Sequence, residues 1–334
     1  MQYPEEYRSS LDLLHTQIAI KLVKDTFERA LARNLSLTRV SAPLMVEKSS
    51  GLNDNLNGVE RPISFEVPAL DDSELEIVHS LAKWKRMALK QYGIRRFKGI
   101  YTDMNAIRRD EKLDCLHSIY VDQWDWEKVI LEEDRNLEFL EGTVDRIMRA
   151  FMETQNVVLE NYPELKPVAQ DSSVYYITSS QLQQMYPDIP AREREFRIVK
   201  EHKTVFIMQI GDRLADGLPH DGRAPDYDDW QLNGDLLFWY DLLECPVEIS
   251  SMGIRVNSDS LLRQLRKADC LNRLSLPYHQ ALINGELPLT MGGGIGQSRL
   301  CMLLLNKAHV GEVQASIWPE WMKKECMEKN IELL

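Results

Sequence analysis

The segment from Gly292 to Leu300 (GGGIGQSRL) combines backbone freedom with a positive charge. Four of its first five residues are glycines, which allow close approach to the backbone and unusual φ and ψ angles. Arg299 follows, and the apolar residues after it predict a buried helix. A glycine-rich loop that leads into a helix with an early arginine is suited to binding a flat base or a phosphate. The alternative is a tight turn before a core helix.

Two common nucleotide-binding motifs are excluded at this segment. The dinucleotide pattern G-x-G-x-x-G, started at Gly294 and Gly296, would need a third glycine where Arg299 stands. A P-loop would end in Gly-Lys-Ser or Gly-Lys-Thr, and no such tripeptide follows. Any nucleotide site here must therefore be of another kind.

Two acidic residues, Asp235 and Glu248, lie in strand-like runs upstream of the glycines. Carboxylates on neighbouring strands near a phosphate-binding arginine predict a Mg²⁺ site, because Mg²⁺ commonly uses one or two carboxylates plus phosphate oxygens. The alternative is a pair of acids on a sheet surface. The second run continues through Ser250, Ser251 and Arg255, which add polar groups and a second arginine.

A third candidate segment begins at Arg108 and continues through His117 to Glu127. Strand alternation from Ser118 onward places Gln123 and Asp125 on the same face. A carboxylate beside an amide could hold an ammonium group and a carboxamide. The alternative is a solvated hairpin with charged edges.

Three further polar segments could contribute to a site. In the helix that follows His79, Lys83 and Arg86 share one face and Lys85 lies on another, although a solvated basic helix would look the same. The stretch from Ser49 to Gly58 is typical of a surface turn. The segment from Arg223 to Trp230 is too acidic for a core and too apolar for a tail.

Composition narrows the class of protein. The chain has 334 residues, 44% of them apolar, and a net charge of −12, which disfavours nucleic acid as a main partner. Its apolar runs are shorter than a membrane span, and the N-terminus lacks the apolar region of a signal peptide. Five scattered cysteines without C-x-x-C spacing favour reduced thiols in the cytoplasm. The histidines show no zinc-binding spacing.

Apolar periodicity predicts an α+β fold with a mainly antiparallel sheet, because strands cluster with helices but lack regular βαβ alternation. Helices are expected at Leu14–Leu31, Leu81–Tyr92, Leu137 to before Pro163, Ser258–Ala268 and Tyr278–Asn284. Strands are expected at Leu35–Val40, Ile63–Val67, Val174–Ile177, Val205–Ile210, Leu236–Trp239, Val247–Val256 and Val313–Ile317.

The chain order of these segments resembles the three motifs of class II aminoacyl-tRNA synthetases. Five of the segments more closely resemble ammonia-dependent asparagine synthetase (aspartate–ammonia ligase), over nearly the whole chain: His79–Arg86, Tyr120–Glu127, Arg223–Trp230, Ser250–Val256 and Gly292–Leu300. The resemblance implies an antiparallel sheet flanked by helices, a single catalytic domain over residues 1–334 and a homodimer formed through the first motif. The implied reaction joins aspartate and ammonia into asparagine with ATP and Mg²⁺, through a β-aspartyl-adenylate that releases pyrophosphate and then AMP.

The resemblance also implies roles for individual residues. The phosphates and ATP would be bound by Arg108, Arg299, Ser118 and Glu248, and Mg²⁺ by Asp235 and Glu248. Aspartate would be recognised through its α-carboxylate by Ser80 and Lys85 and through its ammonium by Asp125, with Ser250, Ser251 and Arg255 orienting the adenylate. Asp54 and Gln123 would lie at the β-carbonyl where ammonia arrives, with Asp54 as a proton acceptor, and Asp228 would shape that pocket.

Two other functions fit parts of the sequence. A tRNA synthetase core shares the adenylation step, but an anticodon-binding module should then precede the first motif, and the negative charge disfavours tRNA. A catalytically silent relative should have lost phosphate or metal ligands, yet Arg108, Asp235, Glu248 and Arg299 are present. No cysteine directly follows Met1, so free ammonia rather than glutamine is the expected nitrogen donor.

Overall fold

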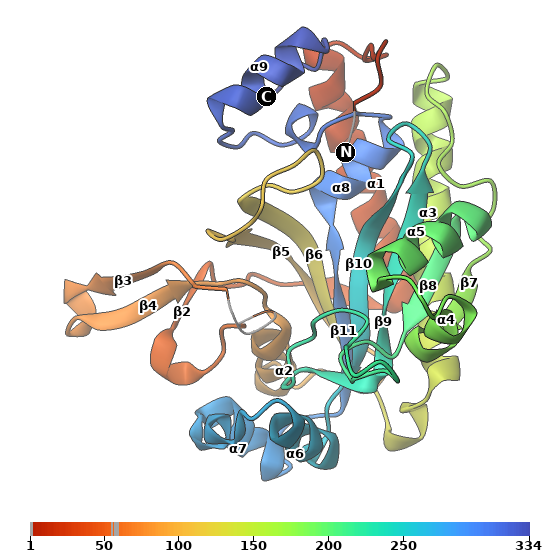
Figure 1. The fold of residues 1–334 in the computed structure, drawn as a ribbon. Coiled ribbons are helices and arrows are strands. Elements are labelled where there is room, and N and C mark those ends of the chain that lie inside the picture. Colours follow the sequence, from red (N-terminus) through yellow and green to blue (C-terminus); the bar gives the residue numbers. More distant parts are fainter. Residues whose placement is uncertain (1–2, 55, 57–59) are drawn as a thin grey trace.

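A twisted sheet forms the centre of the molecule and carries helices on both sides (Figure 1). The computed structural model describes residues 3–54, 56 and 60–334. Within this part, the main sheet has eight strands in the order β1-β5-β6-β11-β10-β9-β8-β7. The pairs β1–β5 and β7–β8 are parallel and the other pairs are antiparallel, which confirms the predicted α+β class. The strands are β1 (Leu37–Arg39), β5 (Gly99–Ile107), β6 (Tyr120–Val129), β7 (Tyr175–Thr178), β8 (Thr204–Met208), β9 (Asp228–Tyr240), β10 (Cys245–Arg255) and β11 (Thr290–Gly296).

A small second sheet projects from this body (Figure 1). It has the order β2-β4-β3 and is built from β2 (Met45–Glu47), β3 (Ser64–Val67) and β4 (Ser73–Ile77). The chain between β2 and β3 carries Asp54, and the neighbouring Asn53 is bonded to Glu76 of β4.

Long amphipathic helices cover one face of the main sheet. The side chain of Asp12 caps the first by accepting a hydrogen bond from the backbone of His15, and Asn136 caps the third in the same way. Phe27 packs on Trp124 of β6 with ring centroids 4.9 Å apart. The helices are α1 (Leu13–Leu35), α2 (Ala82–Gln91), α3 (Leu137–Asn161), α4 (Ser179–Met185), α5 (Ala191–His202), α6 (Ser258–Lys267), α7 (Pro277–Ile283), α8 (Gln297–Leu304) and α9 (Glu320–Glu328). Short 3₁₀ turns are η1 (Lys48–Ser50), η2 (Pro68–Leu70), η3 (Glu132–Asp134), η4 (Leu271–Ser275) and η5 (Val310–Glu312).

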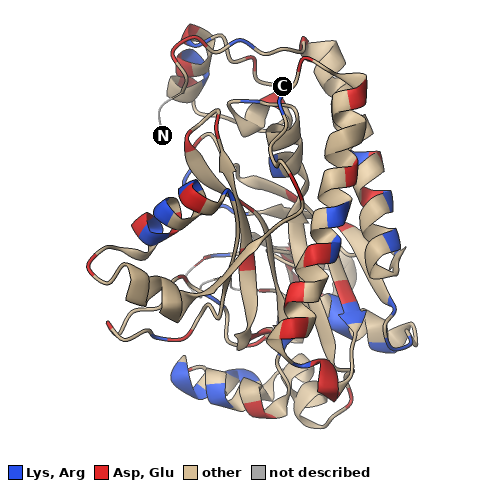
Figure 2. Cartoon of the chain, turned by 90° about the vertical axis from the view of Figure 1, so that its right-hand side faces the viewer, with Lys and Arg blue, Asp and Glu red and all other residues tan. Residues whose placement is uncertain are grey.

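The outer surface mixes charges of both signs. Figure 2 shows basic and acidic residues interspersed along the helices on one side of the molecule. Among the described residues, none of the helices combines the length and the apolar character needed to cross a membrane. All five cysteines lie in the described part of the chain and none forms a disulfide, as their spacing predicts.

The structure corrects three predictions about local structure. The segment 313–317 is not a strand: it follows η5 as irregular chain, where Gln314 is tied by its side chain to Asp122 and Ser298. Leu35 ends α1 and does not begin β1. The glycine-rich segment is not a loop, because Gly292, Gly293, Gly294 and Gly296 lie in β11.

Three of the four glycines of β11, Gly292, Gly293 and Gly294, are needed for space and not for unusual backbone angles. None of these four has a positive φ. A Cβ atom on Gly292 would overlap the carboxylate of Glu127 and the guanidinium of Arg255, and one on Gly294 would overlap the amide of Gln123. The strand therefore has no side chains at the positions where polar and charged side chains of the neighbouring strands lie across it.

We expect Gly292→Ala to lower the free energy of unfolding by about 3 kcal/mol, because the methyl group would displace a buried ion pair. Urea denaturation measures the loss. Gly142→Ala is the control: Gly142 lies in α3 with no atom near its missing Cβ, so alanine there should stabilise by about 0.5–1 kcal/mol. Equal, small effects of the two substitutions would contradict the close packing over β11.

Candidate active site

A cavity of about 390 Å³ opens over the middle of the main sheet, between the 108–118 loop, the start of α8 and the 221–227 segment. Seven residues that the sequence singles out line this cavity: Arg108, Ser118, Gln123, Asp235, Glu248, Ser251 and Arg299. The other seven are packed in a layer of hydrogen bonds and ion pairs beside it: Asp54, Ser80, Lys85, Asp125, Asp228, Ser250 and Arg255. The residues expected to bind phosphate and metal thus all line the cavity, as do Gln123 and Ser251. The residues expected to bind the α-carboxylate and the ammonium group of aspartate lie in the buried layer.

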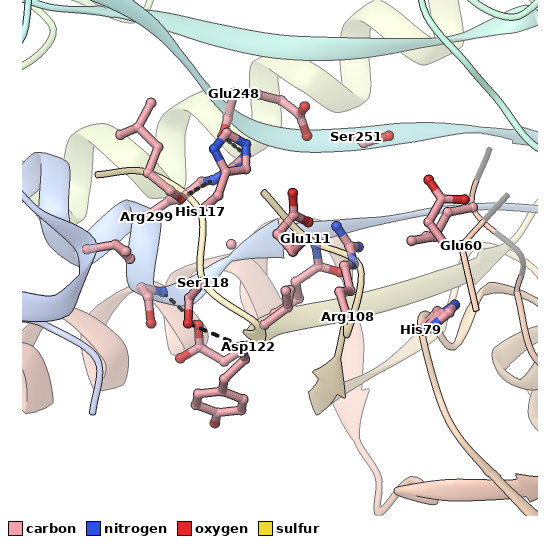
Figure 3. Close-up of a pocket in the computed structure, with 18 of the residues that line it drawn as sticks. Glu60, His79, Arg108, Glu111, His117, Ser118, Asp122, Glu248, Ser251 and Arg299 are labelled. Carbon is pink, nitrogen blue, oxygen red and sulfur yellow. Dashed lines mark hydrogen bonds between the residues drawn. The ribbon is translucent and has the colours of Figure 1, made fainter. Parts of the chain in front are cut away.

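Arg108 and Arg299, two of the arginines that line the cavity, retain donors for an anion. Arg299 donates from Nη1 to the carbonyl oxygen of Glu248 at 3.0 Å and from Nε to that of Leu116 at 3.4 Å. The Nε of Arg108 is buried and has no hydrogen-bond partner among the described residues. An unpartnered buried donor is costly, so a phosphate oxygen at this place would satisfy it. Figure 3 shows both side chains on the wall of the cavity, on either side of Glu111 and His117.

Asp235 and Glu248 lie on the paired strands β9 and β10, and both face the cavity. Burial, together with the negative charge of Asp235, raises the pKa of Glu248. A divalent cation would relieve this repulsion. Within the described part of the chain no three His, Cys, Asp or Glu side chains converge as a metal cage, so a cation here would complete its coordination with substrate oxygens. That donor set fits Mg²⁺.

Arg223 joins the two halves of the site, and the sequence analysis did not single it out as a functional residue. Its Nη2 donates to Oδ1 of Asp235 at 2.7 Å, its Nη1 donates to the hydroxyl of Ser251, and its Nε lies 3.7 Å from Asp228. The sequence feature that could have identified Arg223 is its position at the start of the unusual Arg223–Trp230 segment.

His117 also lines the cavity without having been assigned a role. Its Nδ1 lies 2.8 Å from Oδ1 of Asp114. Burial alone would raise the pKa of Asp114, but His117 and two backbone N–H groups lower it to about 2. The sequence feature that could have identified His117 is its position directly before Ser118, in the short loop that follows Arg108.

Lys85 and Asp125 form a buried ion pair beneath the cavity, with Nζ and Oδ1 2.7 Å apart. Lys85 also donates to the carbonyl oxygens of Trp126 at 3.0 Å and Gly293 at 3.3 Å, so each of its protons has a partner. Burial lowers the pKa of Lys85 even though Asp125 and Glu127 oppose this. The alternative of a solvated basic helix is wrong, because Lys83, Lys85 and Arg86 are all buried.

Arg255 forms a second buried cluster with Glu127 at 2.7 Å and Asp228 at 2.5 Å. Burial alone would raise the pKa of Glu127, but the positive charge of Arg255 outweighs it and lowers the pKa. Ser250 donates to the carbonyl oxygen of Gly294 at 3.0 Å. Charge pairing at this depth holds the strands β6, β10 and β9 in one arrangement around β11. The solvated-hairpin alternative is therefore wrong.

Asp54 is buried, which contradicts the surface turn predicted for this part of the chain. It is 1% exposed and accepts a hydrogen bond from the hydroxyl of Ser80 at 2.9 Å. Its neighbour Asn53 donates to Glu76 of β4 and accepts from the backbone of His79, which pins the turn to the protein. Burial raises the pKa of Asp54. Asn55, Asn57 and Gly58, in the same predicted turn, lie outside the described residues.

The fold places the chain among proteins with a class II aminoacyl-tRNA synthetase catalytic core. Asparaginyl-tRNA synthetase from Pyrococcus horikoshii, complexed with asparaginyl-adenylate, matches with a TM-score of 0.64 at 14% identity over 91% of this chain and 70% of that one. The Entamoeba histolytica asparaginyl-tRNA synthetase complex matches with a TM-score of 0.63 at 14% identity over 90% of this chain and 66% of its own. At such low identity the likeness concerns the fold alone.

Sequence comparison is more specific. The family model for aspartate-ammonia ligase matches residues 14–330. Aspartate–ammonia ligase of Clostridium tetani is 58% identical over 331 residues, covering 99% of this chain and 97% of that one. Its counterpart in Lactobacillus acidophilus is 57% identical over 332 residues, with 99% and 98% covered. The chain therefore belongs to the aspartate–ammonia ligase family, and it catalyses ATP-dependent synthesis of asparagine from aspartate and ammonia.

We expect Arg299→Lys to lower turnover by about two orders of magnitude, because lysine lacks the planar fork that an arginine offers to phosphate. Steady-state kinetics with saturating substrates measure the loss. Arg197→Lys, in an exposed ion pair with Glu193 on α5, is the matched control and should keep activity. Activity of Arg299→Lys close to that of the wild type would make Arg299 a structural residue of the β11–α8 junction.

Proposed function

We propose that the enzyme works in two half-reactions, with the cavity activating aspartate and the buried layer directing ammonia. In the first, the β-carboxylate of aspartate attacks the α-phosphate of ATP, giving β-aspartyl-adenylate and pyrophosphate. In the second, ammonia attacks the β-carbonyl and AMP leaves. The observation that supports this division is the separation of the arginine-lined cavity from the Asp54–Ser80 and Lys85–Asp125 groups beside it.

Charge stabilisation explains the first half-reaction. Arg108 and Arg299 would stabilise the negative charge that develops on the phosphates, with Ser118 beside them. Asp235 and Glu248 would hold Mg²⁺, which supplies charge neutralisation at the phosphates when bound. Arg223 keeps Asp235 and Ser251 in position on their two strands.

Aspartate would lie where the cavity meets the buried layer. Asp125, next to Gln123 on the same face of β6, would bind the ammonium group of aspartate, and Lys85 and Ser80 its α-carboxylate. Because the protons of Lys85 already have partners, binding a carboxylate would require one of these contacts to be exchanged. Ser250, Ser251 and Arg255 would orient the adenylate, and Asp228 would do so by fixing Arg255.

Asp54 would serve the second half-reaction. An anionic carboxylate can attract NH₄⁺ and accept a proton from it, which makes neutral ammonia available beside the β-carbonyl. Gln123 would orient that carbonyl. Since burial raises the pKa of Asp54, this step should lose rate as the pH falls through that pKa, because protonation removes the base.

We expect Asp54→Asn to separate the half-reactions. The asparagine side chain keeps the shape and removes the charge, so asparagine formation should fall about 100-fold, the usual scale for losing a general base. Aspartate-dependent exchange of pyrophosphate into ATP should survive, because it needs only the first half-reaction. If both activities fall together, Asp54 positions aspartate instead, and if neither falls, it has no role in the reaction.

A homodimer is proposed through α1 and β1, which lies at one edge of the main sheet. The helix leaves Leu13, Leu14 and Ile18 exposed, so an apolar strip is available for a second copy. We also place the enzyme in the cytoplasm as one catalytic domain, with free ammonia as its nitrogen donor.

Sedimentation at micromolar concentration should therefore give twice the chain mass of 38.8 kDa. Replacing both Leu14 and Ile18 by arginine should give monomers, because the charges would be buried in the interface. Met327→Arg on α9, where the side chain is also exposed, is the control and should leave the dimer intact. A monomeric wild-type enzyme would reject the proposal.

A further inference from the structure

Asp226 is a buried carboxylate to which no role has been given. Three cationic or potentially cationic groups converge on its Oδ2: Nη1 of Arg273 at 2.9 Å, Nε2 of His279 at 3.0 Å and Nζ of Lys83 at 3.2 Å. Asp226, His279 and Lys83 are all nearly or fully buried. Burial alone would raise the pKa of Asp226, but Lys83, His279 and Arg273 lower it well below its ordinary value.

The partners of Asp226 come from three separate parts of the chain. Lys83 lies in α2, Arg273 in η4 and His279 in α7. Lys83 also donates to the carbonyl oxygen of Gly51 at 3.1 Å, at the start of the turn that carries Asp54. One carboxylate therefore links the Asp54 turn to two other elements.

Asp226 lies next to residues of the active site. Tyr227, directly after it, lines the cavity, and Asp228 holds Arg255. Arg223, three residues earlier, contacts Asp235 and Ser251. A shift of Asp226 would move this whole segment relative to the Asp54 turn.

Stability alone does not account for such a cluster. Desolvation of buried charges offsets much of their attraction, and replacing a buried ionic group by apolar side chains is often neutral or stabilising. Removing one partner would leave an uncompensated buried charge and is strongly unfavourable. The cluster therefore holds the segments that carry its charged groups at a defined distance from one another.

The charges of the cluster also act on Asp54. Its carboxylate interacts electrostatically with Lys83 of α2, Arg273 of η4, and Asp226 and Tyr227 of the 223–228 segment. It also accepts hydrogen bonds from the hydroxyl of Ser80 and the backbone N–H of Leu56. Burial is the largest influence and raises the pKa of Asp54; Lys83 lowers it and Asp226 raises it. The two charges oppose each other at the same carboxylate.

We propose that Asp226 is a positioning residue for the ammonia step: it fixes Lys83 between the Asp54 turn and the 223–228 segment and balances the positive charge that Lys83 presents to Asp54. This inference depends on the role proposed above for Asp54. It predicts that removing the charge of Lys83 and removing the charge of Asp226 shift the pH dependence of the ammonia step in opposite directions.

The test is the pH dependence of asparagine formation in Lys83→Met and Asp226→Asn. Loss of the Lys83 charge makes the Asp54 carboxylate easier to protonate, so the midpoint of the acid limb should move up by roughly one pH unit. Loss of the Asp226 charge should move it down by a similar amount. The titration of ammonium itself is common to all the enzymes and cancels in the comparison.

Two further variants separate positioning from general loosening. Lys83→Arg keeps the charge and should leave the midpoint within a few tenths of a unit of the wild type. Asp229→Asn breaks a different buried pair of the same segment, in which Oδ2 lies 2.8 Å from Nη2 of Arg135, and should lower the melting temperature without moving the midpoint. If Asp226→Asn does not fold, the comparison of Lys83→Met with Lys83→Arg still tests the charge of Lys83 on which the inference depends, and equal midpoints in these two variants would overturn it.

Shifts in the same direction, no shift, or an equal shift in Asp229→Asn would overturn the inference. An acid limb that persists unchanged in Asp54→Asn would instead overturn the role of Asp54, and the inference with it. The wild-type enzyme and Asp54→Asn therefore test the proposed function, whereas the Lys83 and Asp226 variants test the inference.

Discussion

Buried charge lying over glycine positions of the central strand β11 is the constraint on which the rest of the structure depends. Glu127 and Arg255 meet over Gly292, and Gln123 and Asp125 lie over Gly294. A side chain at Gly292 or Gly294 would occupy their place. The fold can therefore bring carboxylates, an amide and cations into the middle of a sheet, where they would otherwise be excluded by packing.

The rest of the site follows from this arrangement. The charges over β11 are neutralised in pairs, so they are held rigidly and cost little in unpaired desolvation. The cavity beside them has groups that are less fully paired: burial and the charge of Asp235 raise the pKa of Glu248, and Nε of Arg108 has no hydrogen-bond partner within the described part of the chain. Groups that are not satisfied within the protein are those best prepared for a charged substrate and its metal ion.

Apolar periodicity predicted the larger elements because it is a local property. Helices α1 and α3 begin at Asp12 and Asn136 caps and bury a regular stripe, and alternation along β6 correctly separated Gln123 and Asp125 from Trp124. The glycine-rich segment was assigned to a loop because glycines usually signal turns. In the structure these glycines leave room for side chains of the neighbouring strands, and the sequence does not show which side chains lie there.

The errors and omissions at the site have the same origin. Asn53 and Asp54 are polar in sequence and buried in the structure. Their polar atoms are bonded by distant residues, Glu76, His79 and Ser80. Arg223 and Asp226 stand in a segment that composition marked as unusual, but only the fold shows which charges meet there. The run at 313–317 has the apolar character of a strand, but Gln314 anchors it instead to Asp122 and Ser298.

The central claim is that this cavity joins the β-carboxylate of aspartate to the α-phosphate of ATP. It is tested most directly with aspartate carrying ¹⁸O in the β-carboxylate, followed by mass spectrometry of the products. Attack at the α-phosphate predicts one ¹⁸O in AMP and the other in the amide oxygen of asparagine, with none in pyrophosphate. AMP without ¹⁸O, or label in a phosphate released together with ADP, would contradict the account.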